Sequence, residues 1–209
     1  MMTLLLMLCC FDVTDEITKT LTDEEKQTIA KMTEVEKAIL DHVLTSNPIA
    51  TQSGWKGIEK DALFYAETGI RVAQVIDEDE FIGTNFDVWV ANAPTSNLSD
   101  GDVVDVSGRL FYCTGNKQYT TALGSTKTVM RIEVVDTDRV VAVASRIGEA
   151  RGYHLFRTGV EGYVLAKPSQ ITKRSVMLQY LGQKKRRTVK RDTLTAADNE
   201  YLDAKQSER

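Results

Sequence analysis

One stretch near the middle of the chain decides the fold class: residues 100–113 read DGDVVDVSGRLFYC. From Val104 to Tyr112 the apolar residues alternate with polar ones, which is the two-residue period of a strand with one buried face. Gly108 interrupts the alternation at a point where a strand can bend sharply, as a small closed barrel requires. The stretch therefore predicts a long, bent strand over Val103–Cys113 in a β-barrel.

The sequence on either side continues this pattern. Short runs rich in Val, Ile, Tyr and Thr are separated by turn-forming residues, most clearly at Asn97–Asp102 and Thr114–Asn116. The other strand candidates are Ile70–Asp77, Phe86–Ala91, Gln118–Ala122, Thr128–Val135 and Arg139–Ala144. Together they predict a small β-barrel over residues 60–146.

A second, smaller β module is expected over residues 150–205. Turn-forming residues, including Lys167–Ser169, separate its strand candidates. These are Tyr153–Phe156, Gly162–Ala166, Ser175–Tyr180 and Arg187–Arg191. Thr195 with Asp198 three residues later predicts the start of a short C-terminal helix.

An N-terminal helix completes the predicted fold. Thr22 and Glu25 have the spacing of a capping box and precede an apolar stripe, so one helix is expected over Thr22–Leu44, within residues 21–47. The predicted class is mainly β (α+β): a first barrel, a second barrel module, an N-terminal helix and a short C-terminal helix.

Length and composition exclude several classes of protein. The chain has 209 residues, of which 42% are apolar and 27% charged, so it is neither fibrous nor wholly disordered. No apolar run approaches the roughly 20 residues of a membrane-spanning helix, and no transmembrane span is expected. Three cysteines without a CxxC pair form no disulfide framework. The oligomeric state does not follow from these features.

The first residues, Met1–Phe11, read MMTLLLMLCCF and have the length of a signal-peptide apolar core. No basic residue precedes this core, and no small-residue cleavage site follows it. Three interpretations of residues 1–20 stay open: a degenerate export signal, a wrongly assigned start, or an apolar N-terminal strand. We favour export, to a periplasm or the outside of the cell, over a cytoplasmic location.

Charge divides the chain into two parts. Residues 148–209 hold 13 Lys/Arg and 7 Asp/Glu, a net charge of +6, which leaves 13 basic and 23 acidic residues, a net charge of −10, in residues 1–147. The basic residues concentrate in Lys184–Arg191. The candidate partner-binding residues are Lys184, Lys185, Arg187, Lys190 and Arg191.

Both faces of such a basic strand cannot be core, so we expect it at an exposed edge. Three roles for it stay open. Lysines on an edge strand discourage pairing with other chains. The same charges can steer an acidic peptide or protein partner, or they can bind phosphates.

The C-terminal segment resembles a known module. Its pattern is Gly162–Ala166, then Val176–Gln179, then Gly182 with basic residues and Val189, and finally Leu194–Leu202, which reads LTAADNEYL. From about Gly152 to Leu202 this order is similar to the SLA-one homology domain, an SH3-like module of an endocytic actin-assembly adaptor and of many bacterial proteins. The sequence departs from the family where an Arg-x-Trp-x-Asp element is usual.

This resemblance implies a protein-binding function. In the adaptor, the module binds a short acidic peptide of the Asn-Pro-Phe-x-Asp type through basic residues beside an apolar pocket. The resemblance does not assign particular residues of this chain to that role.

The middle segment is similar, more coarsely, to OB-type barrels, because Gly101–Leu110 has the cadence of an OB strand. This similarity makes nucleic-acid binding the alternative function. Single-strand binding needs exposed aromatic residues in a basic groove, whereas this segment carries Asp77–Glu80 and further aspartates. We therefore expect Trp89 in the core and no nucleic-acid binding.

Residue patterns typical of catalysis are missing from the sequence. There is no GxSxG, HExxH, P-loop or GxGxxG pattern. Asp77–Glu80 lacks the spaced ligands and the glycine of a calcium loop, and His42 and His154 lack neighbours at metal-ligand spacing. The prediction is a non-catalytic adaptor or scaffold that binds a protein or an acidic peptide, with no metal and no cofactor.

Overall fold

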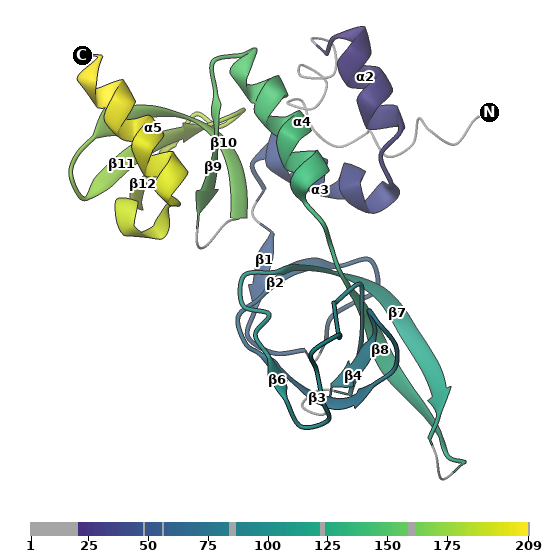
Figure 1. Cartoon of the computed structure of the whole chain (residues 1–209). Coiled ribbons are helices and arrows are strands. Elements are labelled where there is room, and N and C mark those ends of the chain that lie inside the picture. The colour runs from purple at the N-terminus through teal and green to yellow at the C-terminus, as the bar shows by residue number, and fades with distance from the viewer. Residues whose placement is uncertain are drawn as a thin grey trace. The chain divides into compact units, whose positions relative to one another are not determined.

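The computed structural model describes residues 21–47, 49–55, 57–83, 87–121, 124–158 and 162–208. These residues confirm the mainly β, barrel-like class: they form an eight-stranded curled sheet, a four-stranded sheet and four α-helices (Figure 1). The chain divides into two compact units. The split unit combines Met1–Pro48 with Thr137–Arg209, and the barrel unit is Ile49–Asp136. The predicted export signal lies outside the described residues.

The N-terminal part of the split unit contains two helices, so the prediction of one helix over Thr22–Leu44 was wrong. Helix α2 runs Asp23–Ala30 and helix α3 runs Glu34–Thr45. The predicted capping box at Thr22 is confirmed. Thr33 forms a second capping box, and its side chain accepts a hydrogen bond from the backbone of the new helix, which ends the first helix and starts another.

Helix α4, Asp138–Glu149, also corrects a prediction, because a strand was expected over Arg139–Ala144. A short apolar run fits a strand and a buried helix equally well. The longer pattern decides: the buried residues recur at helical spacing, namely Val140, Val143, Ala144, Ile147 and Gly148. This apolar face packs against α3 and against strands β9 and β10.

The four-stranded sheet is antiparallel, in the order β12-β11-β10-β9. Its strands are β9 (His154–Thr158), β10 (Gly162–Ile171), β11 (Ser175–Tyr180) and β12 (Arg186–Lys190). All four predicted strands are present. The turn predicted at Lys167–Ser169 is instead part of β10, which continues through a bulge between Pro168 and Gln170.

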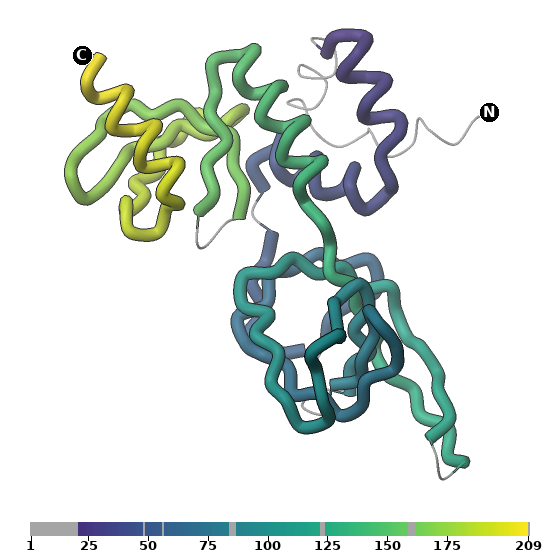
Figure 2. The backbone as a smooth tube through the Cα atoms, in the orientation of Figure 1, coloured from purple at the N-terminus to yellow at the C-terminus, as the bar shows by residue number. Residues whose placement is uncertain are grey.

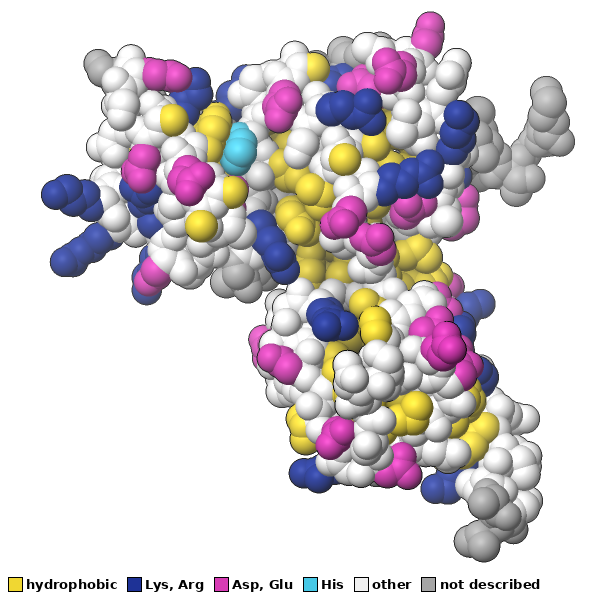
Figure 3. Space-filling view, viewed as in Figure 1, with side chains coloured by type: hydrophobic (Ala, Val, Ile, Leu, Met, Phe, Trp, Pro, Cys, Tyr) yellow, Lys and Arg dark blue, Asp and Glu magenta, His cyan; other side chains and the backbone are white. Residues whose placement is uncertain are grey.

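A short 3-10 helix, η1 (Arg191–Thr193), follows β12, and helix α5 (Ala196–Ser207) ends the described chain. The predicted cap at Thr195 is confirmed, since its hydroxyl accepts from the Asp198 N–H. Lys and Arg side chains project into solvent beside β11 and β12 (Figure 3).

The barrel unit is built from eight strands, of which β7 and β8 are long, and its backbone curls into a barrel (Figure 2). They are β1 (Ala50–Gln52), β2 (Leu63–Ala66), β3 (Ile70–Val75), β4 (Phe81–Gly83), β5 (Val88–Ala91), β6 (Val103–Val104), β7 (Leu110–Thr120) and β8 (Thr126–Val134). The order is β1-β2-β7-β8-β5-β4-β3-β6, and β5 and β8 run parallel. The barrel was predicted over residues 60–146, whereas this unit starts before β1 and ends before α4.

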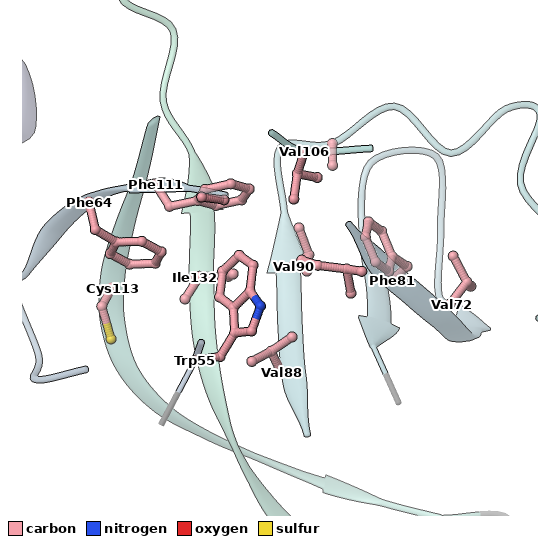
Figure 4. Close-up of a cluster of buried hydrophobic side chains, with 13 residues drawn as sticks. Trp55, Phe64, Val72, Phe81, Val88, Val90, Val106, Phe111, Cys113 and Ile132 are labelled. Carbon is pink, nitrogen blue, oxygen red and sulfur yellow. The ribbon is translucent and has the colours of Figure 1, made fainter. Parts of the chain in front are cut away.

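Aromatic side chains fill the centre of the barrel unit (Figure 4). The Trp55 ring meets Phe64 and Phe111 edge-on, at centroid distances of 5.6 and 5.4 Å. Each such ring contributes on the order of 2 kcal/mol when it is fully buried. Cys113 lies in the same core, and burial raises the pKa of its thiol, which makes it an unreactive residue.

The stretch that decides the fold forms two strands rather than one. β6 ends at Val104 and β7 begins at Leu110, with a tight turn between them. Gly108 lies in that turn with φ +73°, a backbone conformation that residues with a Cβ rarely adopt. β6 and β7 continue one antiparallel ladder, against β3 and β2, so the predicted bend at Gly108 is a kink between two strands that run in the same direction.

The turn predicted at Thr114–Asn116 was wrong, because these residues lie inside β7. Gly115 has φ +106°, and the pairing with β8 shifts there by one residue. A glycine with this conformation is typical of a bulge in a continuous strand as well as of a turn. The bulge leaves β7 and β8 as one long hairpin.

Candidate functional site

The predicted partner-binding residues surround β12, the edge strand of the four-stranded sheet. β12 pairs on one side with β11, where Val176 lies opposite Val189. Val189 is half-buried and packs on the apolar core of this sheet, while the other four residues of β12 are exposed. Val189 thus attaches β12 to the core of the sheet, and the basic side chains beside Val189 lie at the surface.

Four of the five predicted residues lie on this surface. Lys184 and Lys185 are exposed in the turn from β11 into β12, and Lys190 is exposed where β12 ends. The Arg187 guanidinium lies over the Tyr180 ring, 5.2 Å from its centroid, a cation–π contact that orients the side chain. With Arg186, these residues form what we call the basic edge.

Arg191, the fifth predicted residue, is engaged inside the protein. Its Nε donates to the side-chain oxygen of Asn199 over 2.7 Å, and a terminal nitrogen donates to the Asn199 carbonyl over 3.0 Å. The guanidinium also pairs with Asp203 at 2.9 Å, and 13% of the side chain is exposed. Arg191 therefore holds α5 against the end of β12.

The basic edge has an unusual electrostatic environment. Residues 162–191 contain nine Lys/Arg and no Asp or Glu. Among the described residues, Lys184, Lys185, Arg186 and Lys190 form no ion pair. Their mutual repulsion is not offset within the sheet, so an anionic partner gains attraction without displacing an internal acid.

Helix α3 anchors the turn that carries the lysines. Ser46, which ends α3 with φ 52°, is buried, and its hydroxyl donates to the Leu181 carbonyl over 3.2 Å. The Gln183 side-chain amide donates back to the Ser46 carbonyl over 3.2 Å. These two bonds connect the base of the turn, just before Lys184, to the end of α3.

A second cluster, around Asp198, joins β9 to α5. His154 Nε2 lies 3.2 Å from the Asp198 carboxylate, and the imidazole stacks on the Tyr201 ring at 3.8 Å. The other Asp198 oxygen accepts from the Arg157 N–H and the Thr195 hydroxyl, at 3.1 and 2.7 Å. The sequence indicated Asp198 as a capping residue, but His154 stands 44 positions away and no local pattern connects the two.

The charge state of Asp198 follows from these contacts. Burial alone raises its pKa, but hydrogen bonds from His154, Thr195 and the Arg157 backbone outweigh burial and lower the pKa. The described residues contain no group of three or more metal-ligating side chains. The Nδ1 of His42 is buried without a hydrogen-bond partner among the described residues.

The barrel unit carries its own charged cluster, centred on Glu80. One carboxylate oxygen accepts from the Trp89 ring N–H at 2.9 Å and lies 3.4 Å from the Lys117 ammonium. The other lies 3.2 Å from the Arg131 guanidinium, which also pairs with Glu133. Burial raises the Glu80 pKa, but hydrogen bonds led by that from Arg131 outweigh it and lower the pKa.

This cluster covers Trp89, which is buried as predicted. The Lys117 ammonium lies 3.5 Å from the Trp89 ring centroid, and Tyr119 meets the ring edge-on at 5.9 Å. Ile82 and Val129 complete a small apolar cluster separate from the central core. The indole face and its N–H are thus both occupied by the chain itself.

An open hollow lies beside the acidic turn of the barrel unit. Asp77–Asp79 line it together with Asn92 and Pro94. The Asp79 N–H donates to the Asp77 carboxylate. A side-chain hydrogen bond with Asp77, then desolvation, then repulsion from Asp77 raise the Asp79 pKa. All three acids are exposed, as expected of a solvated hairpin tip.

Comparison with known proteins gives no relative: no protein-family model, no curated protein and no solved structure matches this chain. None of the described helices combines the length and the apolar content needed to cross a bilayer.

Proposed function

We propose that this chain is a non-catalytic adaptor that binds an acidic segment of another protein through its basic edge. The observation that carries the proposal is the set of exposed cations on an edge strand, in a 30-residue stretch without a single acid. Lys184, Lys185, Arg187 and Lys190 supply the attraction. Arg191 has a positioning role, because its donors hold α5.

The strand order around the basic edge supports an SH3-like module resembling the SLA-one homology domain. Such modules are small barrels whose last strand closes onto the first. Here Leu194, which follows β12 and the 3-10 helix, forms an antiparallel bridge with Thr158 of β9. Other residues of the C-terminal motif pack inward as well, namely Asp198, Tyr201 and Leu202.

The topology of the barrel unit supports an OB-type barrel, which has five strands. β3 follows closely after β2, and β3 pairs with β6 while β2 pairs with β7. β2 with β3, and β6 with β7, therefore each behave as one long, bent strand. Apart from β1, which adds in parallel to β2, the sheet then reduces to five strands, in which β5 and β8 form a parallel pair.

Nucleic-acid binding by the barrel is the competing function, and its surface argues against it. OB barrels bind oligonucleotides on the face of their second and third strands and on adjoining loops. The corresponding strands, β4 and β5, carry Trp89 with its ring covered by Lys117, and the loop before β4 is acidic. Phosphates would be repelled there, and bases would find no free aromatic face.

The test is a titration of the full chain with a synthetic peptide in which Asp alternates with Val around one Phe. Saturable binding is expected, weakened by added salt because part of the attraction is electrostatic. Lys184→Glu/Lys185→Glu should weaken it about tenfold or more, the effect of roughly 1.4 kcal/mol.

The matched control is Lys60→Glu/Lys127→Glu, which changes the net charge equally at two exposed residues of the barrel unit. It should bind like the parent chain. If both double variants lose the same affinity, net charge alone is responsible and the proposed site is wrong. Retention of poly-dT with salt-sensitive affinity would favour the nucleic-acid alternative.

A further inference from the structure

The backbone of β12 has a free side whose position can be worked out from its ladder. The Arg191 N–H donates to the Arg174 carbonyl over 2.9 Å, which makes these two residues a hydrogen-bonded pair. Such pairs alternate with unbonded ones along an antiparallel ladder, so every second residue of β12 directs its backbone to β11. Arg186 and Thr188 lie between those residues, and their N–H and C=O groups point away from the sheet.

This free side ends at Lys190. Its carbonyl, which would continue the outward row, accepts a hydrogen bond from the Thr193 hydroxyl at 2.7 Å. Beyond it the chain turns into η1 and α5. The backbone groups of Arg186 and Thr188 thus form a short open edge, next to Lys184 and Lys185.

The positive charge beside this open edge determines which kind of molecule can bind there. A second copy of the chain would bring an identical basic strand alongside, and like charges on adjacent strands destabilise pairing. A phosphate backbone would satisfy the cations and the N–H donors, but it offers no donor to the outward C=O groups. An extended acidic peptide satisfies the cations, the outward N–H groups and the outward C=O groups.

We propose that an acidic, extended segment of a partner protein adds to β12 as a further strand of the sheet. The segment exchanges backbone hydrogen bonds with Arg186 and Thr188. This inference rests on the proposed function and specifies how the basic edge recognises its partner.

Side-chain alternation gives the pattern that the partner needs. Arg186 and Lys190 lie on the face of the sheet opposite to Val189, because neighbouring strand residues point to opposite faces. Directly opposed residues of neighbouring strands are close enough for ion pairs. Acids at alternate positions of the added strand would therefore all meet this face, whereas only every second acid of a contiguous block would.

The decisive variant is Thr188→Pro. It removes the outward N–H without changing any charge or any hydrogen bond to β11, and proline is tolerated at such positions of edge strands. Binding of the Asp-Val peptide should weaken at least tenfold. Thr188→Val keeps the N–H and should bind within about twofold of the parent chain.

A modified peptide provides a second measurement that does not depend on the folding of a variant. Methylation of alternate backbone nitrogens on the edge-facing side of the peptide blocks strand pairing, while the same methylation on the other nitrogens does not. Only the first peptide should lose affinity for the unmodified chain. Equal binding of both peptides would overturn strand addition.

The outcomes separate this inference from the proposed function. If Lys184→Glu/Lys185→Glu weakens binding while Thr188→Pro and the methylated peptides bind normally, the basic edge binds acids without strand addition. If none of these changes affects binding, both proposals fail. If poly-dT or vesicles with anionic lipids bind and the peptide does not, the partner is not a peptide, and strand addition is excluded.

Discussion

Two groups of cationic side chains on this chain lie in opposite environments, one beside a half-buried carboxylate and one at an exposed edge. Around Glu80, in the barrel unit, the cations Lys117 and Arg131 converge on one half-buried carboxylate, which also accepts the Trp89 N–H. Along β12, in the split unit, the cations are exposed, and residues 162–191 hold no acid. Lys and Arg side chains therefore stabilise the fold around Glu80 and are accessible to a partner along β12.

This difference separates charged residues that stabilise the fold from charged residues that can bind a partner. Removing one member of a half-buried hydrogen-bonded cluster leaves its partners without compensation and destabilises the fold. Exposed cations without partners contribute little to stability. Substitutions should therefore change stability at the buried carboxylates and change binding at β12, with little overlap.

The largest loss of stability is expected at Asp198, the most buried carboxylate among the described residues of the split unit, with 5% of its side chain exposed. Asp198→Ala leaves the Thr195 hydroxyl and the Arg157 N–H without their acceptor. The expected cost is about 3 kcal/mol, since each unsatisfied buried donor costs about 1–3 kcal/mol. Urea unfolding monitored by circular dichroism measures it. Glu200→Ala, at an exposed acid on α5, is the control and should cost far less.

The next effect concerns the barrel unit. Glu80→Ala removes the acceptor of the Trp89 N–H and the partner of Lys117 and Arg131, with 17% of the Glu80 side chain exposed. The expected cost is about 2 kcal/mol, less than at Asp198 because water can reach the freed cations. Trp89 fluorescence should change as well, since its environment is opened. A loss equal to that of Glu78→Ala, at an exposed neighbour, would show that the cluster adds nothing.

A third, smaller effect is the dependence of stability on pH. The pKa values of Glu80 and Asp198 are lowered in the folded protein, so both carboxylates bind protons more weakly there than in the unfolded chain. Their contribution is complete well above the ordinary carboxyl pKa of about 4, and it is lost as the pH falls through the lowered values. Urea midpoints at neutral pH and below pH 4 test this. Glu80→Gln and Asp198→Asn should each flatten the acid-side decrease.

The sequence predicted the elements whose signals are local. Alternation predicted the four strands of the smaller sheet and β3, β5, β6, β7 and β8 of the barrel unit, but not β1, β2 or β4. Thr22 and Thr195 predicted two helix starts. It failed where a short pattern has two meanings: a run of small apolar residues became α4, and Gly115 marked a bulge instead of a turn. Only the longer spacing of buried residues, or the partner strand, separates these cases.

The candidate site was predictable in part for the same reason. The basic run is contiguous, so its place at an exposed edge followed from strand geometry alone. That Arg191 turns inward depends on Asn199 and Asp203, which a later helix supplies. The clusters around Glu80 and Asp198 join residues tens of positions apart, and a single sequence carries no signal for such contacts.

The smallest effect on stability is expected at the basic edge, and it separates binding from edge protection. Lys184→Ser/Lys185→Ser/Arg186→Ser should leave the urea midpoint unchanged, because these side chains have no partner among the described residues. It should weaken the Asp-Val peptide strongly. Sedimentation at increasing protein concentration then shows whether the variant self-associates, as a bare edge strand would. Self-association together with unchanged peptide affinity would assign the cations to edge protection alone and remove the basis of the adaptor proposal.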